Sequence, residues 1–145
     1  MYLNNVKLNT NVIDAARYLR PSRFTFMSTG CVYSENVPSP TPESAANGTP
    51  EETNYGYGLA KWVGEEQCRL LQAETLQNIT IVRAFNLYGA RDHYDDASSH
   101  VVPALIKKIE DGMNPVVVWG TGNQTRTFVN ARDLAFFLLA LTMKK

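Results

Sequence analysis

The run of residues 78–85, Asn-Ile-Thr-Ile-Val-Arg-Ala-Phe, constrains the fold of this chain more than any other stretch. It is rich in β-branched and aliphatic residues, which is typical of a strand buried in a parallel sheet. A second strand pattern covers residues 23–28 and ends in small polar residues. Helical patterns occupy residues 3–19 and 56–76, before and between the two strands. This alternation of helix and strand predicts an α/β fold.

The remaining segments extend the same pattern. The first helix is predicted to be amphipathic, and Pro21 ends it. The residues that recur at helical spacing on its mainly apolar face are Val6, Asn9, Val12, Ile13, Ala16 and Leu19. Residues 35–54 carry four prolines and Asn47-Gly48, which indicates a loop. We expect a helix at residues 101–109 with Pro103 in its first turn, and strands at 116–119 and 126–129. Asn130 or Asp133 is expected to begin the last helix.

Composition excludes several classes of protein. The 145 residues are 44% hydrophobic, enough for one ordinary core, and 14 basic residues balance 14 acidic ones. A net charge of zero gives no electrostatic reason to expect nucleic acid or an anionic membrane as a partner. No apolar run approaches the ~20 residues that span a bilayer. Two cysteines are too few for a disulfide scaffold, so we expect a cytoplasmic protein.

The second helix carries a pair of residues with chemical potential. Tyr57 and Lys61 are four residues apart, so both side chains lie on one face of the helix. A nearby cation favours the phenolate form of tyrosine. Thr29 follows the strand at residues 23–28, at the carboxyl end where α/β sheets bind ligands. Its hydroxyl would complete a proton-transfer triad, although Ser28-Thr29-Gly30 also suits a plain turn.

Four segments of the sequence resemble one family in the correct order and with similar spacing. They are Ser28-Thr29-Gly30-Cys31-Val32-Tyr33, Tyr57-x-x-x-Lys61, Arg83-Ala84-Phe85-Asn86-Leu87-Tyr88-Gly89 and Arg126-x-Phe128-x-x-Ala131-x-Asp133. The family is the extended branch of the short-chain dehydrogenase/reductases, which are NAD-dependent epimerases and dehydratases. Within it, residues 86–89, 99–106 and 116–120 are most similar to the GDP-L-fucose synthases.

The resemblance implies a function for each matching residue. Tyr57 would donate a proton to the C4 oxygen of a hexose, with Lys61 holding the nicotinamide ribose of NAD(P) and lowering the tyrosine pKa. Thr29 would stand where the family has serine or threonine. Cys31 and His100 would supply the base and acid that epimerise C3 and C5. The main chain at Asn86 and Leu87 would lie near the nicotinamide, and Arg126 would bind the nucleotide diphosphate of the substrate.

Each of these residues also has an ordinary structural explanation. His100 suits a polar position at a helix N-terminus, and Cys31 suits a small core residue. Arg126 and Asp133 suit an exposed ion pair of little energetic value. Dehydratases of the family carry Thr-Asp-Glu where this chain has Thr29-Gly30-Cys31, and the lack of both carboxylates argues against water elimination.

The resemblance also implies an organisation in two parts. Residues 1–85 would be the C-terminal part of a dinucleotide-binding domain with an incomplete, Rossmann-like doubly wound parallel sheet. Residues 86–145 would begin the substrate-binding lobe and add a returning helix. We further expect a homodimer through the helix at residues 56–76, with Trp62 and Leu70 buried between subunits.

One family feature does not occur in this sequence. No Gly-x-x-Gly-x-x-Gly turn is present to hold the pyrophosphate of a dinucleotide at a helix N-terminus. The sequence therefore suggests the middle of a longer epimerase-reductase, inactive when isolated. The competing hypothesis is a non-catalytic product, either a relic or a module that binds a nucleotide-sugar or a partner without turnover.

Overall fold

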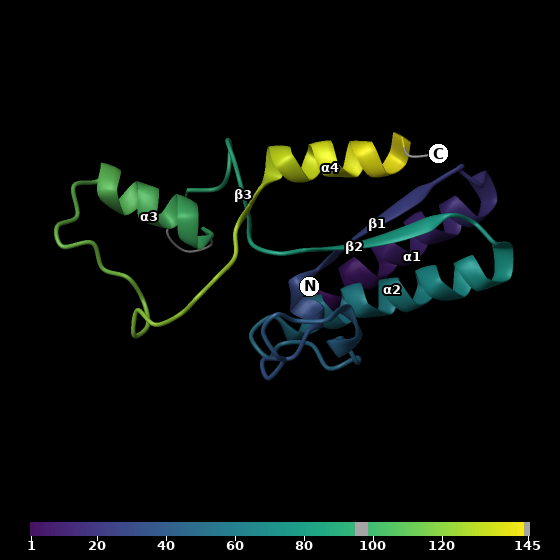
Figure 1. Ribbon diagram of the computed structural model, residues 1–145, viewed down its shortest axis with the longest axis horizontal. Helices are drawn as coiled ribbons and strands as arrows, with labels where there is room; N and C mark the ends of the chain where they lie inside the picture. Colours follow the sequence, from purple (N-terminus) through teal and green to yellow (C-terminus); the bar gives the residue numbers. More distant parts are fainter. Residues whose placement is uncertain (95–98, 144–145) are drawn as a thin grey trace. The chain divides into compact units, whose positions relative to one another are not determined.

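The computed structural model describes residues 1–94 and 99–143. The chain divides into two units, Met1–Ala84 and Phe85–Lys145, and each is described here by itself. The first unit contains two helices and two strands, and the second contains two helices and two very short strands (Figure 1). Both units mix helix with parallel strands, which confirms the predicted α/β class.

A parallel strand pair forms the centre of the first unit. Strand β1 (Phe24–Thr29) pairs with strand β2 (Ile79–Ala84), in a register that places Phe24 opposite Ile79 and Thr29 opposite Ala84. Helices α1 (Tyr2–Leu19) and α2 (Tyr55–Thr75) run side by side along this pair (Figure 1). All four elements were predicted, and each boundary agrees to within one residue.

The core of this unit lies between the two helices and one face of the strands. It contains Ile13, Phe26, Cys68, Leu71 and Ile79, with Phe24 and Ile81 packed against it. Successive strand residues point to opposite faces, so Phe24 and Phe26 share this face with Ile79 and Ile81. Within β2 only Ile79 is buried, and the other five residues are intermediate. The prediction of a wholly buried strand is therefore wrong for this unit, because the helices cover only one face.

Helix α1 shows how a helical pattern can mislead at single positions. Its buried residues are Asn9, Ile13 and Ala16. Val12 and Leu19, which were predicted to lie on the apolar face, are 48% and 80% exposed. Asn9 is buried because its Nδ2 donates a hydrogen bond of 3.1 Å to the carbonyl oxygen of Ala60 in α2. A buried amide with a partner costs little, so the interface between the two helices accepts it.

The loop predicted at residues 35–54 is present. It includes one short 3₁₀ turn, η2 (Glu43–Ala45), and is preceded by another, η1 (Gly30–Val32). Val32, Tyr33 and Ala46 form a second small core, and Trp62 of α2 packs against it. The loop is therefore anchored on α2 by apolar contact.

The second unit is built around the parallel pair of β3 (Leu87–Tyr88) and β4 (Val129–Asn130). Helix α3 (Val101–Glu110) has Pro103 in its first turn, as predicted, and helix α4 (Ala131–Met143) follows β4 directly. The Asn130 Oδ1 atom accepts a hydrogen bond of 2.9 Å from the Arg132 N–H, so Asn130 fills the capping role predicted for Asn130 or Asp133.

Two strand predictions in this unit need correction. Residues 116–119 form no strand, and Val117, Val118 and Trp119 are 56%, 57% and 83% exposed. The predicted strand at 126–129 is reduced to β4. A run of β-branched residues becomes a strand only when a neighbouring strand accepts its hydrogen bonds, and β4 gains such a neighbour in β3.

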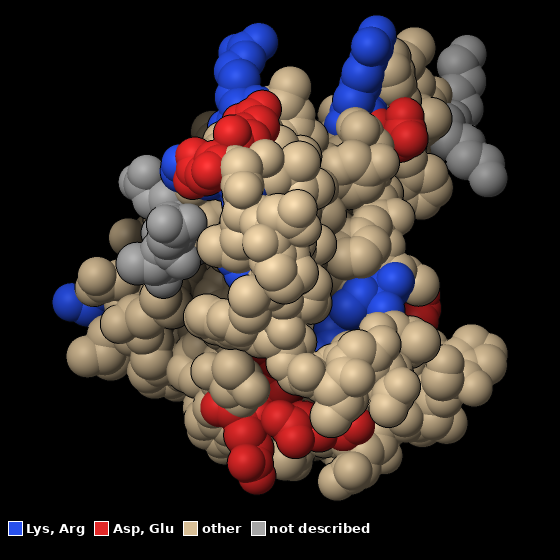
Figure 2. All heavy atoms as spheres, turned by 90° about the vertical axis from the view of Figure 1, so that its left-hand side faces the viewer, with Lys and Arg blue, Asp and Glu red and all other residues tan. Residues whose placement is uncertain are grey.

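The surface carries charges of both signs. On the face that Figure 2 presents, Lys and Arg side chains stand at several separate places and most of the surface belongs to other residues. This face therefore shows no broad basic stripe of the kind that binds nucleic acid. In the part of the chain that the structure describes, no helix is long and apolar enough to cross a membrane.

Candidate active site

Three predicted site residues meet where β1 ends and α2 begins. Thr29 is the last residue of β1, and its Oγ1 accepts a hydrogen bond of 3.3 Å from the Cys31 N–H. The Thr29 hydroxyl also lowers the pKa of the Cys31 thiol and of the Tyr57 phenol. This hydroxyl therefore lies near both groups that could carry protons.

Glycine makes this arrangement possible. A Cβ atom on Gly58 would lie 2.3 Å from the carbonyl oxygen of Cys31 and 2.7 Å from the Cβ atom of Pro50. Both distances are shorter than any real contact of this kind, so only glycine lets the first turn of α2 approach the Cys31 backbone. Tyr57, the preceding residue, is brought against Thr29 and Cys31 by the same approach.

The environment holds both acids in their protonated forms. Burial raises the pKa of Tyr57, the charge of Cys31 raises it further, and the hydrogen bond with Thr29 opposes the rise. Burial likewise raises the pKa of the Cys31 thiol, and the Thr29 hydrogen bond again acts in the opposite direction. The lowering of the Tyr57 pKa by Lys61 stays a prediction, and in this chain burial has the largest effect and raises that pKa. A protonated tyrosine is nevertheless the form that a proton donor needs.

Lys61 lies one turn further along α2. Its Nζ atom donates a hydrogen bond of 2.8 Å to the carbonyl oxygen of Met27 in β1 and lies 5.1 Å from the centre of the Phe26 ring. Burial lowers the pKa of this ammonium group. Lys61 is therefore a half-buried cation that is anchored on β1, one helical turn from Tyr57.

The other predicted site residues belong to the second unit. Asn86 has a left-handed backbone (φ 34°), and its Nδ2 donates a hydrogen bond of 2.9 Å to the Thr127 carbonyl oxygen. Leu87 begins β3. His100 directly precedes α3, and its Nδ1 lies 3.8 Å from Asp92 Oδ1. Arg126 is exposed and donates to the carbonyl oxygen of Thr125.

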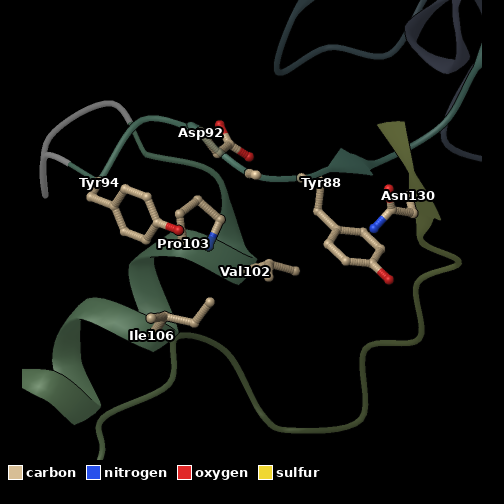
Figure 3. Close-up of a pocket in the computed structure, with 9 residues that line it drawn as sticks. Tyr88, Asp92, Tyr94, Val102, Pro103, Ile106 and Asn130 are labelled. Carbon is tan, nitrogen blue, oxygen red and sulfur yellow. The ribbon is translucent and has the colours of Figure 1, made fainter. Parts of the chain in front are cut away.

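The second unit contains an open pocket of about 220 Å³ beside these residues. Figure 3 shows Tyr88 and Asn130 together on one side of it and Tyr94 with Pro103 on the other. Asp92 also lines the pocket and is the residue that contacts His100. Aromatic side chains with a few polar groups are typical of pockets that bind small molecules.

The sequence was compared with known protein families. The model of the NAD dependent epimerase/dehydratase family matches residues 1–145, which is the whole chain. The chain belongs to this family.

Individual relatives of this epimerase/dehydratase chain are longer than it is. GDP-L-fucose synthase 1 of Arabidopsis thaliana is 35% identical over 136 residues, which cover 90% of this chain and 42% of that protein. The GDP-L-fucose synthase of Escherichia coli is 32% identical over the same shares. The crystal structure of a GDP-L-fucose synthetase from Naegleria fowleri bound to NADP matches with a TM-score of 0.86 and 25% identity, over 97% of this chain and 48% of that one. The chain thus spans less than half the length of these relatives, and the fold matches theirs.

One group in this epimerase/dehydratase chain was missed by sequence reasoning. Glu65 lies in helix α2, and its side chain is 0% exposed. Its carboxylate accepts hydrogen bonds from Arg83 Nε and Nη2 (2.9 and 2.7 Å) and from Ser28 Oγ (2.5 Å), and Arg69 Nη2 adds a fourth at 2.9 Å. The network ties α2 to the residue before Thr29 and to the end of β2.

The electrostatics of this network favour the ionised carboxylate. Burial alone would raise the pKa of Glu65, but the hydrogen bonds and charges of its partners outweigh burial and lower it. The available sequence signal was Arg83, a charge inside an otherwise apolar strand, which requires an acidic partner. The same Arg83 also donates hydrogen bonds of 2.7 Å to the Tyr33 hydroxyl and to the Glu43 carbonyl oxygen.

Proposed function

We propose that this chain is part of an NAD(P)-dependent nucleotide-sugar epimerase-reductase similar to the GDP-L-fucose synthases. Its reactions would be C3 and C5 epimerisation and C4 keto reduction of GDP-4-keto-6-deoxymannose. The observation that carries the proposal is the meeting of Thr29, Cys31 and Tyr57 at the end of β1. A plain reductase needs only a hydroxyl and a tyrosine there, and a thiol adds the means for a second proton transfer.

The reduction would use the residues of the first unit. Tyr57 donates its proton to the C4 oxygen, and its raised pKa keeps that proton available at neutral pH. Thr29 would orient the phenol, because its hydroxyl lies near enough to lower the pKa of Tyr57. Lys61 and Tyr57 fit the ribose of the nicotinamide half, because an anchored ammonium and a hydroxyl lie one helical turn apart. The cofactor supplies the hydride, and the main chain at Asn86 and Leu87 would border the nicotinamide.

The epimerisation would use Cys31 and His100. Inversion of a carbon beside a ketone needs one group that removes a proton and another that returns it, and a thiol and an imidazole can both transfer protons. Arg126 would bind the diphosphate of the substrate, since its guanidinium offers paired donors. Its exposed side chain donates a hydrogen bond to the adjacent Thr125 carbonyl oxygen, which fits a group that turns toward a ligand.

The test separates the two reactions in the complete enzyme that contains residues 1–145. Cys31→Ser and His100→Asn should suppress solvent-deuterium exchange at the sugar carbons beside the ketone, measured by mass spectrometry. Tyr57→Phe should instead slow hydride transfer by roughly two or more orders of magnitude. Tyr55→Phe, at an exposed neighbouring position, is the matched control and should leave both rates unchanged. Unchanged exchange in Cys31→Ser would replace the proposal with a simple reductase.

A non-catalytic relic or a nucleotide-sugar-binding module is the second candidate. It is favoured by the lack of a glycine-rich pyrophosphate turn in these 145 residues. This second candidate would be supported if the complete protein showed neither deuterium exchange nor hydride transfer.

We also propose a homodimer through α2 and a cytoplasmic location. Leu70 is 63% exposed on α2, and Leu8 and Val12 are 61% and 48% exposed on the neighbouring α1. Trp62, which we expected in the interface, packs instead against the loop of its own chain. Both cysteines are free, which suits a reducing compartment.

The dimer is tested by sedimentation. The wild-type chain should sediment as a dimer at micromolar concentration, and Leu70→Glu should shift it to monomer because a charge would be buried at the interface. A wild-type monomer, or a dimer indifferent to Leu70→Glu, would contradict this interface.

A further inference from the structure

The guanidinium of Arg83 has two sides, and each side holds a different part of the chain. Its Nε and Nη2 atoms donate hydrogen bonds of 2.9 and 2.7 Å to the two carboxylate oxygens of Glu65 in α2. Its Nη1 atom donates one hydrogen bond of 2.7 Å to the Tyr33 hydroxyl and another of 2.7 Å to the Glu43 carbonyl oxygen. Because a guanidinium is planar and rigid, fixing one side on Glu65 also fixes the direction of the other side. Arg83 therefore joins α2 to the segment that follows η1.

Tyr33 is the residue at which η1 ends. Its backbone N–H donates a hydrogen bond of 3.1 Å to the Gly30 carbonyl oxygen, which closes the turn around Cys31. Its side chain is 6% exposed and belongs to the second small core. The Arg83 Cζ atom lies 5.0 Å from the centre of the Tyr33 ring, which is within the range of a cation–π contact. The arginine thus holds both the ring and the hydroxyl of this tyrosine.

We propose that Tyr33 is a positioning residue for Cys31 and is itself held in place by Arg83. Cys31 lies inside η1, which has a support at each end. At the first end, the Cys31 N–H donates a hydrogen bond of 3.3 Å to Oγ1 of Thr29, the last residue of β1. At the other end, the support is the Tyr33 hydroxyl on Arg83. Hydrogen-bond geometry within a short 3₁₀ turn is poor, so the position of η1 depends on these outside contacts.

The consequence for chemistry rests on the proposed epimerase function. A thiol that exchanges a proton with a sugar carbon must be held at reaction distance, since a displacement of about 1 Å can lower a rate by about a hundredfold. Tyr57 and Lys61 reach the site from α2. Arg83 holds α2 through Glu65, and that bond does not involve the Tyr33 hydroxyl. Loss of the hydroxyl should therefore impair epimerisation and spare reduction.

The first measurement is backbone amide hydrogen exchange in this chain, followed by NMR without any sugar. Tyr33→Phe removes the hydroxyl and keeps the buried ring. The N–H groups of Cys31 and Tyr33 should exchange about tenfold faster, as expected for the loss of one hydrogen bond to a charged group, and amides within α2 should be unchanged. Tyr18→Phe is the matched control. Tyr18 also has an arginine over its ring, with Arg17 Cζ 5.8 Å from the ring centre, but it is 74% exposed and its variant should leave η1 unchanged.

The second measurement separates positioning from folding, in the complete enzyme that contains residues 1–145. Tyr33→Phe should lower kcat for solvent-deuterium exchange at the sugar by about tenfold or more and leave KM unchanged. It should also leave hydride transfer to the already epimerised ketone unchanged, whereas a merely structural role would slow both reactions. Arg83→Lys keeps a positive charge beside Glu65 but lacks the planar fork, so it should impair deuterium exchange too. Adding Tyr33→Phe to Arg83→Lys should cause little further loss, because both variants break the same link.

Wild-type amide exchange of η1 in Tyr33→Phe would overturn the proposal. Unchanged deuterium exchange at the sugar, equal losses of deuterium exchange and hydride transfer, or an additive loss in the double variant would also overturn it. A wild-type enzyme without deuterium exchange at the sugar would instead overturn the proposed function. The amide measurement would then still decide whether Tyr33 positions Cys31.

Discussion

At the scale of single residues, the site depends on the fact that Gly58 has no side chain. Glycine costs up to about 1 kcal/mol relative to alanine inside a helix, so its presence in α2 needs a reason. The reason is the Cys31 carbonyl oxygen, which a Cβ atom would approach to 2.3 Å. Backbone cannot move aside as a flexible side chain can, so the helix itself would have to shift.

Gly56 and Gly58 allow a matched test. Gly58→Ala should lower the free energy of unfolding by about 1–3 kcal/mol through overpacking. Gly56→Ala should be neutral or stabilising by up to about 1 kcal/mol, because its nearest neighbour, the Cβ atom of Tyr2, would lie at an ordinary 3.6 Å. Urea denaturation measures the free energy of unfolding of both variants. Equal stability of the two would show that the close approach of Gly58 to the Cys31 carbonyl oxygen is not maintained in solution.

At the scale of elements, Glu65 and Arg83 connect α2 to the carboxyl ends of both strands. Glu65 is fully buried and the Arg83 side chain is 12% exposed, so each charge depends on the other. Buried ion pairs add little net stability over apolar residues, but the loss of one partner leaves an uncompensated charge. The network therefore acts mainly to fix the position of α2 against Ser28, one residue before Thr29.

Glu65→Ala should lower the free energy of unfolding by about 3–5 kcal/mol, because it leaves the Arg83 charge without its partner. The double variant Glu65→Leu with Arg83→Met leaves no unpaired charge, so its free energy of unfolding should fall much less. Glu66→Ala removes the adjacent glutamate, whose side chain is 46% exposed, and should change stability by no more than about 0.5 kcal/mol. Thermal denaturation compares the three. A double variant as unstable as Glu65→Ala would mean that packing, not the unpaired charge, causes the loss.

The same pair gives a pH dependence with a defined sign. The pKa of Glu65 is lowered in the folded chain. Its contribution to stability is therefore present above the ordinary glutamate pKa and is lost as the pH falls through the lowered folded value. The difference in stability between the wild type and Glu65→Ala should accordingly shrink in acid.

At the scale of the whole molecule, the function that we propose gives this chain residues for only half of a dinucleotide. Tyr57, Lys61 and Asn86 would lie beside the nicotinamide, and no glycine-rich turn for the pyrophosphate occurs in the 145 residues. Each remaining hydrogen bond contributes about 0.5–1.5 kcal/mol net. Association costs several kcal/mol, which these few bonds cannot offset.

Residues 1–145 alone should therefore bind NADH and NADPH no more tightly than about millimolar, and should show no turnover. Isothermal titration calorimetry with each cofactor measures the affinity, with Lys61→Ala as the control for any weak signal. A micromolar dissociation constant would mean that a pyrophosphate site exists elsewhere in the chain.

The sequence by itself determined the elements of the first unit and the family, because periodicity and ordered motifs are local properties of the chain. Helix α2, the two paired strands and the Tyr57–Lys61 spacing could all be read from adjacent residues. Only the tertiary structure decided that Glu65 is buried, that Val12 is exposed, and that residues 116–119 form no strand. The burial of a polar residue depends on a partner far along the chain, such as Arg83 for Glu65 or Ala60 for Asn9. A polar side chain is exposed or buried according to whether folding brings it a partner, and no local pattern records that.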